Sequence, residues 1–449
     1  MIQIVDPLQS FLFLAMKVLS TCLFFAGSAL YWRGCYAAPP STFQANGVPF
    51  KSPVATAPGF SARVLFSNLT TPRGITLDAE ENILVVERGF GITAFSPTNG
   101  GWERQVVVSN PNFTQGIQIA GCLLYVSTAA DVLVYRYDAL SKSVTGEGVP
   151  STLVTGIPAD GDLTTHTLQL QHSAGYTSLL IATGPLTNID PTARDPASGR
   201  SQIRRFVLPH DIPPAPLQWA TGQIVAYGIR NPAGFAFHPS SSDHLYVLEN
   251  GASVDDVAGL THAFVNDNPA DELNLVTPNG TLQFYGFPDC TTLWNPQADP
   301  TGDRQYVGLK KGDQISLLLE PDRDNAWCSS SANNVPPVLS FQAHSVPLDV
   351  KFYKTPTAPS AASFPAAFDG DAVVSFHGSF NRAPPTGYGV VHAAFPFQQN
   401  YTFIVQATNL TSCPGSCIRP VGLAFSSSGV LYVSSDSSGE LFAVERSSN

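Results

Sequence analysis

One short stretch of the chain carries residue types that could bind a charged ligand. It runs from Tyr227 to Asp256 and begins with the pair Arg230-Asn231, which offers a guanidinium and an amide. Two apolar strand patterns follow, separated by a polar turn, and the second ends in Glu249-Asn250-Gly251. Because a turn brings both ends of a hairpin to one edge of a sheet, side-chain donors should meet loop carbonyls there. This arrangement predicts a ligand site built from one hairpin.

The same hairpin pattern recurs along the chain. Each copy has an apolar strand, a turn and an apolar strand rich in Tyr, Val and Leu, usually followed by a third strand. The copies begin at Arg73, Gln115, Leu168, Gly234, Leu348 and Val421. Six copies of roughly 40–70 residues predict radially packed four-stranded blades, because one such sheet cannot bury both faces alone. We therefore expect an all-β fold, a six-bladed β-propeller. A large β-sandwich is the alternative, although sandwiches rarely repeat one hairpin so regularly.

The composition agrees with a turn-rich β fold. The chain has 36 Gly and 37 Pro, and 43% of its residues are hydrophobic. Only 13% of the residues are charged, and the net charge is −11. This acidic balance argues against a nucleic-acid partner, which would need basic patches.

The N-terminus predicts export. From Met16 the chain has a lysine, an apolar run and small residues that suit cleavage after Ala37, and translation starting at Met16 is an alternative. A membrane anchor is the competing interpretation, but Lys17 and Arg33 interrupt the apolar run. We expect a signal peptide over residues 1–37 and a single propeller domain over 38–449. Five sequons indicate glycosylated surface loops: Asn68, Asn112, Asn279, Asn400 and Asn409.

The cysteines suit an oxidising compartment. Cys413 and Cys417 have the spacing of a tight disulfide loop, and Cys290 is expected to pair with Cys328 across an insertion. A zinc site is the competing idea, but no C-x-x-C pair or His cluster completes it. Cys122 is expected to be a buried free thiol, because it begins the apolar pattern CLLYV.

Several motifs in order resemble a known family. YGIRNPAGFAF and LENGASVDD resemble the soluble pyrroloquinoline quinone (PQQ) sugar dehydrogenases and the sorbosone dehydrogenase-like proteins. NDNPADELN, FPDC, AHSVPLDVKFY, FHGSFNRAPPTGYGVV and IRPVGLAF resemble their secreted fungal branch, the PQQ-dependent pyranose dehydrogenases. The resemblance covers roughly residues 55–445. The fold it implies, a six-bladed β-propeller, agrees with the repeats.

The resemblance implies a cofactor site around Arg230. PQQ is a planar tricarboxylate, and arginine both grips carboxylates and stacks on flat rings. By the family pattern, Arg230 and Asn231 lie at the quinone edge, where Arg230 stabilises a developing oxyanion. The carbonyls of Gly251 and Ala252 fall where bacterial relatives bind Ca²⁺. Those relatives have proline at the second position, so Ala252 is a departure that a carbonyl ligand tolerates.

Further candidates for the PQQ pocket follow from the same resemblance. Each opens or follows one of the hairpin repeats, and each could instead be a structural residue, such as an arginine paired with a neighbouring aspartate. They are Arg73, Gln115, His344, His377, Arg382 and Arg419.

The expected catalytic base is missing from its usual position. In bacterial relatives this base is a histidine directly after an aspartate, and here Asp162 is followed by Leu163. His166 lies three residues further on, so on a regular strand it would face the side opposite to Leu163. A bulge could still bring His166 or Asp162 to the substrate, and both stay candidates for the base. Altered or lost activity is the alternative.

Together these features predict a secreted oxidoreductase. It would oxidise a sugar hydroxyl by hydride transfer to Ca²⁺-bound PQQ, and pass electrons to an external acceptor such as a separate cytochrome or redox enzyme. We expect a monomer. A calcium-dependent propeller lactonase or hydrolase is one alternative, and a non-catalytic propeller that binds a glycan or cofactor is another.

Overall fold

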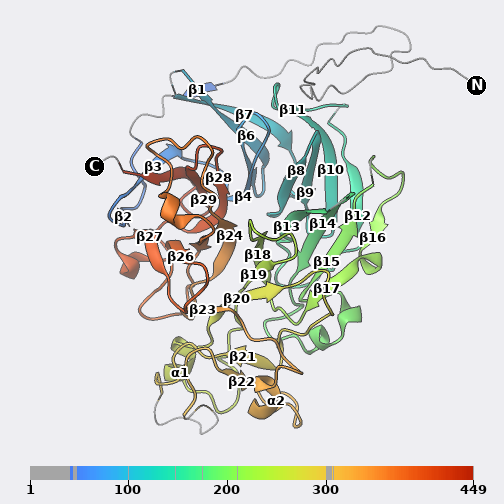
Figure 1. Ribbon diagram of the computed structural model, residues 1–449, viewed down its shortest axis with the longest axis vertical. Coiled ribbons are helices and arrows are strands. Elements are labelled where there is room, and N and C mark those ends of the chain that lie inside the picture. The colour runs from blue at the N-terminus through green and yellow to red at the C-terminus, as the bar shows by residue number, and fades with distance from the viewer. Residues whose placement is uncertain are drawn as a thin grey trace, which may run out of the picture. The chain divides into compact units, whose positions relative to one another are not determined.

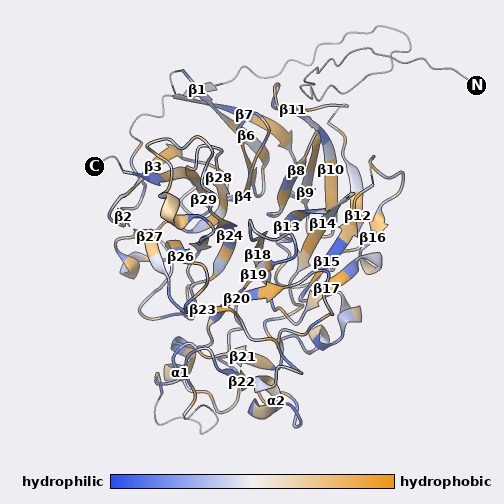
Figure 2. Cartoon of the chain, in the orientation of Figure 1, coloured by the Kyte–Doolittle hydropathy of each residue, from blue (hydrophilic) through white to orange (hydrophobic). Residues whose placement is uncertain are grey.

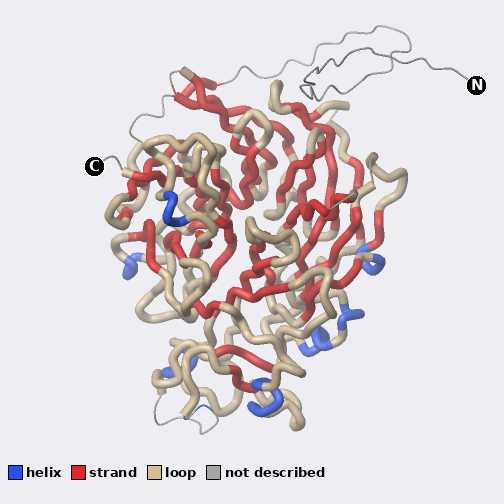
Figure 3. Tube along the Cα trace, viewed as in Figure 1, coloured by secondary structure: helices blue, strands red, loops and turns tan. Residues whose placement is uncertain are grey.

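The structure is a computed structural model, and it describes residues 41–43, 48–99, 101–146, 148–173, 175–209, 211–299, 306 and 308–447. Residues 40–449 form one compact unit. The expected signal peptide, residues 1–37, lies outside the described residues. Strands dominate the described chain, and its helices are single turns (Figure 3). Its α-helices, α1 (His262–Asn266) and α2 (Asn325–Ser329), have five residues each, and none of the described helices could span a membrane.

The predicted six-bladed propeller is confirmed. Six antiparallel sheets surround a centre, and β4, β8, β13, β18, β24 and β28 are the inner strands (Figure 1). The strands of each blade are given from the inner to the outer one. Blade 1 has β4 (Pro72–Leu77), β5 (Ile83–Glu87), β6 (Gly91–Thr98) and β7 (Gly101–Ser109); blade 2 has β8 (Ile117–Ala120), β9 (Leu123–Ser127), β10 (Asp131–Asp138) and β12 (Ser151–Thr155); and blade 3 has β13 (Leu168–Ser173), β14 (Tyr176–Thr183), β15 (Gln202–Val207) and β17 (Gln223–Tyr227). Blade 4 has β18 (Pro232–Phe237), β19 (Leu245–Glu249), β20 (Asp271–Val276) and β23 (Leu339–Phe341); blade 5 has β24 (Pro347–Phe352), β25 (Ala372–Phe376), β26 (Gly389–Ala393) and β27 (Thr402–Ala407); and blade 6 has β28 (Pro420–Phe425), β29 (Leu431–Ser435), β30 (Glu440–Arg446) and β3 (Phe60–Phe66).

Every hairpin expected from the repeats is present, but the way the ring closes was not predicted. The outer strand of blade 6 is β3, which comes from the start of the chain and pairs antiparallel with β30. Val64 lies opposite Phe442, and Phe60 opposite Arg446. The two ends of the chain are therefore held together by a shared sheet, which removes a pair of open edges.

Short elements extend this frame. β1 (Ser41–Phe43) pairs with β7, β2 (Val54–Thr56) with β27, β11 (Ser143–Val144) with β10 and β16 (Leu217–Gln218) with β12. Single 3₁₀ turns are η1 (Pro191–Arg194), η2 (Pro196–Ser198), η3 (Trp219–Thr221), η5 (Ala366–Phe368) and η6 (Leu410–Ser412). Between β20 and β23 the chain leaves blade 4 and forms a lobe, residues 277–338, with β21 (Cys290–Thr292), β22 (Gln314–Ser316) and α2 (Figure 1).

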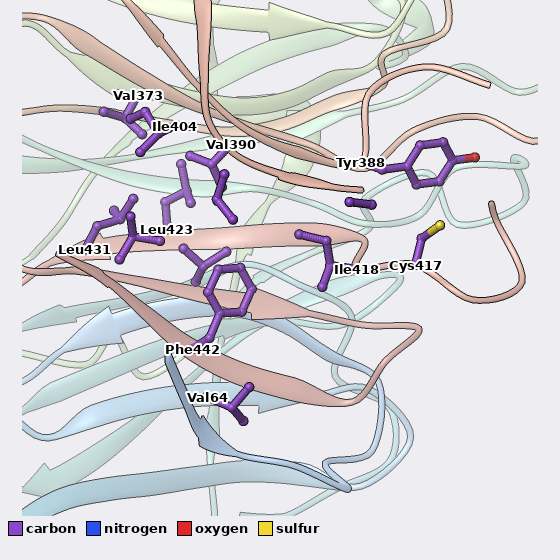
Figure 4. Packing of buried hydrophobic residues seen from close by; sticks show 14 of the residues in the cluster. Val64, Val373, Tyr388, Val390, Ile404, Cys417, Ile418, Leu423, Leu431 and Phe442 are labelled. Atoms are coloured by element: carbon purple, nitrogen blue, oxygen red, sulfur yellow. The ribbon is translucent and has the colours of Figure 1, made fainter. Parts of the chain in front are cut away.

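Apolar side chains fill the spaces between successive blades. The strands carry hydrophobic residues while many loops are hydrophilic (Figure 2). Between blades 5 and 6, for example, Val373, Val390 and Ile404 pack against Leu423 and Leu431 (Figure 4). All five of these residues are buried. Burying a side chain of this kind contributes about 1.5–3 kcal/mol, so the packing between blades stabilises the ring.

Glycines let the inner strands approach one another closely. A Cβ on Gly74 would lie 2.1 Å from the carbonyl oxygen of Gln115 in the next blade. The corresponding distances are 2.3 Å from Gly116 to the His166 oxygen, 2.4 Å from Gly234 to the Leu348 oxygen and 2.5 Å from Gly422 to the Arg73 oxygen. Blade 3 has Thr167 at this position, and its hydroxyl donates a hydrogen bond to the Ala233 carbonyl instead. Backbone contacts between blades therefore set the width of the central channel.

The cysteine predictions are confirmed with one correction. Cys290 pairs with Cys328, and Cys413 with Cys417. Cys122 is free, as expected, but it is exposed rather than buried. It occupies the turn before β9, so it precedes the buried part of the apolar pattern. All five sequon asparagines are exposed, as the prediction of surface loops requires.

The glycine contacts predict the effect of adding one methyl group. Gly74→Ala should destabilise the fold by about 2–3 kcal/mol, because backbone atoms of two blades would have to move apart. Gly415→Ala is the matched control, since its Cβ would meet nothing nearer than 3.6 Å. Guanidinium-induced unfolding of both variants measures the difference. Equal stabilities of the two variants would contradict this account of the ring.

Candidate functional site

A cavity of about 390 Å³ lies at the end of the ring where the inner strands of blades 3–5 begin. Loops that precede an inner strand, or that follow the second strand of a blade, supply its walls. The lining residues are Leu163, Asn188, Arg230, Asn231, Asn250, Gly251, Ala252, Ser253, Pro269, Asp271, His344, Val346, Ser379, Phe380 and Asn381. The predicted hairpin site is therefore part of a cavity, and the Arg-Asn pair and the Gly-Ala loop share it.

Arg230 is held in place by backbone and amide oxygens. Its Nε donates to the carbonyl of Asn188 at 2.9 Å, and its Nη2 to Asn188 Oδ1 at 3.0 Å. Its Nη1 donates to the carbonyl of Asn250 at 3.2 Å. A guanidinium has five N–H donors, so those not used by these described residues can meet a ligand. Burial lowers the pKa of Arg230, while the nearby Glu249, Asp271 and Asp162 raise it.

A chain of amides fixes the neighbouring residue. Asn231 donates from Nδ2 to Asn250 Oδ1 at 2.8 Å, and Asn250 donates from its own Nδ2 to the carbonyl of Pro347 at 2.7 Å. Both asparagines are buried. The amide chain joins the starts of β18 and β24, so it positions the cavity wall across two blades.

The loop after β19 lines the cavity and contains two carbonyl groups without a partner among the described residues. Within the described part of the chain, the carbonyls of Gly251 and Ala252 accept no hydrogen bond, whereas those of Asn250 and Ser253 bind Arg230 and Asn188. The amide N–H of Gly251 donates to Asp271 Oδ1 at 2.9 Å, which fixes the loop. Unpaired carbonyls beside a carboxylate suit a hard divalent cation such as Ca²⁺. No group of three or more His, Cys, Asp or Glu side chains among the described residues could hold a metal by itself.

A separate network joins the predicted residues of blades 1, 2, 5 and 6. Arg73 pairs with Asp436 at 2.6 Å and donates to Gln115 Oε1 at 2.5 Å. His377 Nε2 contacts Asp436 Oδ1 at 3.0 Å, and Arg419 Nη2 contacts His377 Nδ1 at 2.8 Å. Because arginine only donates, Nδ1 is the acceptor and Nε2 carries the proton. The four predicted residues lie together, but they are not among those that line the 390 Å³ cavity.

The charges of this network are mutually stabilised. Burial opposes ionisation of Asp436, but the hydrogen bond from His377 and the charge of Arg73 hold its pKa below the usual range. Burial lowers the pKa of His377, which favours its neutral form. Arg73 Nε is buried and has no hydrogen-bond partner among the described residues.

Arg382 has a different environment. Its Nη2 donates to Asp267 Oδ1 and its Nη1 to the carbonyl of Pro384, both at 2.6 Å. These contacts close the loop after β25 against the segment that precedes β20. Arg382 does not line the cavity, although its neighbours Phe380 and Asn381 do.

The candidate bases are placed differently from one another. Leu163 lines the cavity at the position where a base was expected. His166 is buried outside the cavity, and its two ring nitrogens contact the carbonyls of Ala182 and Ala129 at 2.9 and 2.8 Å. It therefore has no ring nitrogen directed to a ligand in the cavity, because both face backbone oxygens. Asp162 is exposed beside Leu163, and its charge acts on Arg230.

His344 lies in the cavity wall, and its tautomer is defined by a hydrogen bond. Its Nε2 lies 2.9 Å from the carbonyl of Val265. A carbonyl can only accept, so Nε2 carries the proton and Nδ1 of the neutral ring keeps its lone pair. The backbone of His344 is left-handed, with φ 65°. His344 therefore has a ring nitrogen that can accept a proton, a role that the sequence motifs did not assign to it.

Some residues of the site carried no separate signal in the sequence. Phe380 is 82% exposed although it lines the cavity, which is unusual for an aromatic ring. Asn188 and Asn250 bind Arg230, and Asp436 joins Arg73 to His377. Phe380 and Asn250 lie inside motifs quoted above, whereas Asp436 is 363 residues from Arg73 in the sequence.

Two buried carboxyl groups lie behind Arg230. Glu249 accepts the backbone N–H of Arg230 at 2.7 Å, and Asn274 Nδ2 lies 3.1 Å from Glu249 and 3.2 Å from Glu272. Burial raises the pKa of Glu249 well above its ordinary value and that of Glu272 to about 7. Two adjacent buried carboxylates resist joint ionisation, so the pair retains a proton near neutral pH.

The chain is similar to characterised proteins over most of its length. The profile of a family described as TrAA12-like matches residues 54–447. The pyrroloquinoline quinone-dependent sugar dehydrogenase of Hypocrea jecorina is 31% identical over 430 residues, covering 90% of this chain and 91% of that protein. The pyrroloquinoline quinone-dependent pyranose dehydrogenase of Coprinopsis cinerea is 32% identical over 448 residues, covering 92% of this chain. This chain covers 56% of that second relative, or about half its length.

A solved structure agrees with the fold. It is the holo form of the PQQ domain of pyranose dehydrogenase from Coprinopsis cinerea, with 29% sequence identity and a TM-score of 0.77. The match covers 90% of this chain and 99% of the solved one.

The buried glutamates predict how stability depends on pH in protein without added cofactor or metal. The folded state favours the protonated form of Glu272. The contribution of Glu272 to the free energy of unfolding is therefore fully present below about pH 4.5 and is lost as the pH rises through about 7. Glu272→Gln should remove about 2 kcal/mol of this dependence, because an amide does not titrate. Urea unfolding between pH 5 and 8 measures it, and Glu445→Gln, in an exposed ion pair, is the control. A wild-type slope in Glu272→Gln would contradict the assignment.

Proposed function

The chain belongs to the TrAA12-like family, and on that premise we propose that it is a secreted dehydrogenase that oxidises a sugar hydroxyl with PQQ as its cofactor. The two fungal relatives are named as PQQ-dependent sugar and pyranose dehydrogenases. One observation carries the proposal. Arg230, Gly251 and Ala252 line the same cavity, and the carbonyls of Gly251 and Ala252 accept no hydrogen bond from the described residues, so a fixed cation and oxygen ligands are available together.

The residues of the cavity fit a planar polycarboxylate. Arg230 and Asn231 supply N–H donors, and the network of Arg73, His377 and Arg419 adds positive charge at the same end of the ring. The carbonyls of Gly251 and Ala252 supply oxygen ligands for Ca²⁺. Bound PQQ supplies the electron-accepting quinone that a sugar hydroxyl needs to become a carbonyl. Arg230 keeps its charge beside that group, where it stabilises negative charge as it develops.

Phe380 provides a surface for the sugar. Its ring stands exposed at the rim of the cavity, beside the amide of Asn381. A pyranose has an apolar C–H face that packs on an aromatic ring, while its hydroxyls bond to amides. The pair thus holds a sugar against the cavity and excludes water from one face of it.

His344 accepts the hydroxyl proton. Its Nδ1 keeps a lone pair because Nε2 is bound to the carbonyl of Val265. Leu163 cannot accept a proton, and the ring nitrogens of His166 are bound to Ala182 and Ala129. Asp162 is the second candidate, since it lies exposed next to Leu163. A hydride from the same carbon would pass to PQQ held by Arg230 and Asn231, so the proton and the two electrons would each have an acceptor.

The protein is proposed to be secreted and to pass its electrons to a separate protein. Five exposed sequons support a secreted glycoprotein. Electrons leave for a separate acceptor such as a cytochrome or redox enzyme, and the protein acts as a monomer. A propeller lactonase would need several Asp, Asn and Glu side chains converging on a metal. Asp271 and several asparagines do line the cavity, but Arg230 lies among them, and no group of three or more His, Cys, Asp or Glu side chains in the described chain could hold a metal.

Cofactor binding is tested with Arg230→Ala. The variant should bind PQQ in the presence of Ca²⁺ about 10- to 100-fold more weakly than wild type, because charge-assisted hydrogen bonds are lost. Isothermal titration calorimetry of apo-protein measures this. Arg136→Ala, in an exposed ion pair with Asp211, should match wild type. No heat from folded wild-type protein with PQQ and Ca²⁺ would overturn the proposal.

Proton transfer is tested at His344 and Asp162. His344→Gln should reduce sugar-dependent dye reduction about 10²- to 10⁴-fold while PQQ still binds, because loss of a general base has effects of this size. Asp162→Asn should stay within a few-fold of wild type. The opposite result, with activity lost in Asp162→Asn and kept in His344→Gln, would move the base to Asp162.

A further inference from the structure

Another cavity, of about 460 Å³, lies where the lobe of residues 277–338 meets blade 3. It contains none of the residues that line the cavity around Arg230. Its size is within the range of about 300–1,000 Å³ found for small-molecule sites. Backbone contacts fix the junction, because Tyr285 donates to Tyr227 and Phe287 to Gly228, at 3.0 and 2.9 Å.

Three aromatic rings form its apolar part. Tyr227 and Phe284 have ring centroids 5.1 Å apart, and Phe284 lies 6.2 Å from Trp327. All three are half-buried. Gly228 permits this packing, because a Cβ there would lie 2.4 Å from the ring of Phe284. The rings therefore leave some apolar surface accessible at a junction that backbone hydrogen bonds fix.

Neutral polar groups surround these rings. Thr281, Gln283 and Ser331 are exposed on the rim, and Asn333 is half-buried. Gln283 makes no hydrogen bond to any other described residue, whereas Asn333 Nδ2 donates to the carbonyl of Trp327 at 3.2 Å. Hydroxyl and amide groups can each donate and accept, so they match the hydroxyls of a sugar.

The arginines of this cavity are already neutralised. Arg194 binds Asp289 through Nε and Nη2 and binds Glu320 through Nη1 at 2.6 Å. Arg323 also pairs with Asp289, and its guanidinium lies 4.8 Å from the centre of the Trp327 ring. Two positive charges thus face two carboxylates, so the cavity offers no excess positive charge to an anionic ligand.

We propose that this cavity is a non-catalytic binding site for a neutral pyranose unit of an oligosaccharide or polysaccharide. Aromatic faces bind the C–H face of the sugar ring, and the amide and hydroxyl rim binds its hydroxyls. The site does not depend on the proposed dehydrogenase activity, since no residue of the cavity around Arg230 contributes to it. It would hold a glycan close to that cavity, because only two residues separate Tyr227 from Arg230.

The test is binding of soluble neutral pentasaccharides to apo-protein, which cannot turn the sugar over. Cello-, xylo-, malto- and laminaripentaose are titrated separately and followed by calorimetry. We expect at least one to bind wild type, and Trp327→Ala to weaken it about tenfold, because an aromatic contact is lost. Trp294→Ala removes another tryptophan of the same lobe, one that lies under Lys311, and should match wild type.

Two further variants separate the possible outcomes. Phe380→Ala removes the aromatic ring of the other cavity, so retained binding in this variant places the sugar at the lobe. Gln283→Ala, which breaks no described hydrogen bond, should weaken binding about two- to tenfold if Trp327→Ala fails to fold. The proposal is overturned if no pentasaccharide binds folded wild type, if binding is lost in Phe380→Ala but kept in Trp327→Ala, or if oligogalacturonate binds more tightly than the neutral sugars.

Discussion

The close approach of the six inner strands is the constraint on which the rest of the structure depends. At Gly74, Gly116, Gly234 and Gly422 a carbonyl of the next blade occupies the space of a side chain. Because the strands converge there, the loops at their starts meet in a small area. Residues from blades 3, 4 and 5 can therefore line one cavity, although Leu163 and Asn381 are far apart in the sequence.

That convergence also concentrates charge away from water. The backbone N–H of Arg230 donates to the buried Glu249, and Arg73 pairs with Asp436 while Arg419 contacts His377. Each cation is held by several oxygen or nitrogen acceptors, which limits its movement and retains its charge in spite of burial. Of these cations, Arg230 lines the 390 Å³ cavity and presents fixed donors to a ligand there, so little reorganisation is needed when the ligand binds.

The sequence predicted what depends on local pattern. Alternating apolar residues and turns identified all six hairpins, and the Arg-Asn and Gly-Ala motifs identified one cavity wall. Contacts between distant segments were not predictable in this way, and they include the pairing of β3 with β30 and of Arg73 with Asp436. Burial was also misjudged where a pattern begins, since Cys122 lies in the turn before β9. The free nitrogen of His344 depends on a carbonyl 79 residues away, which no motif encodes.

The pairing of β3 with β30 has a consequence for synthesis of the chain. β3 is made among the first residues of the propeller, but its partner ends at Arg446. The strands of five blades therefore emerge from the ribosome before the sixth blade can be completed. During translation β3 is an unpaired apolar strand that could pair with other exposed strands. It carries Val64, Leu65 and Phe66, which are all buried in the final fold. The ring can thus close only after β30 has been synthesised.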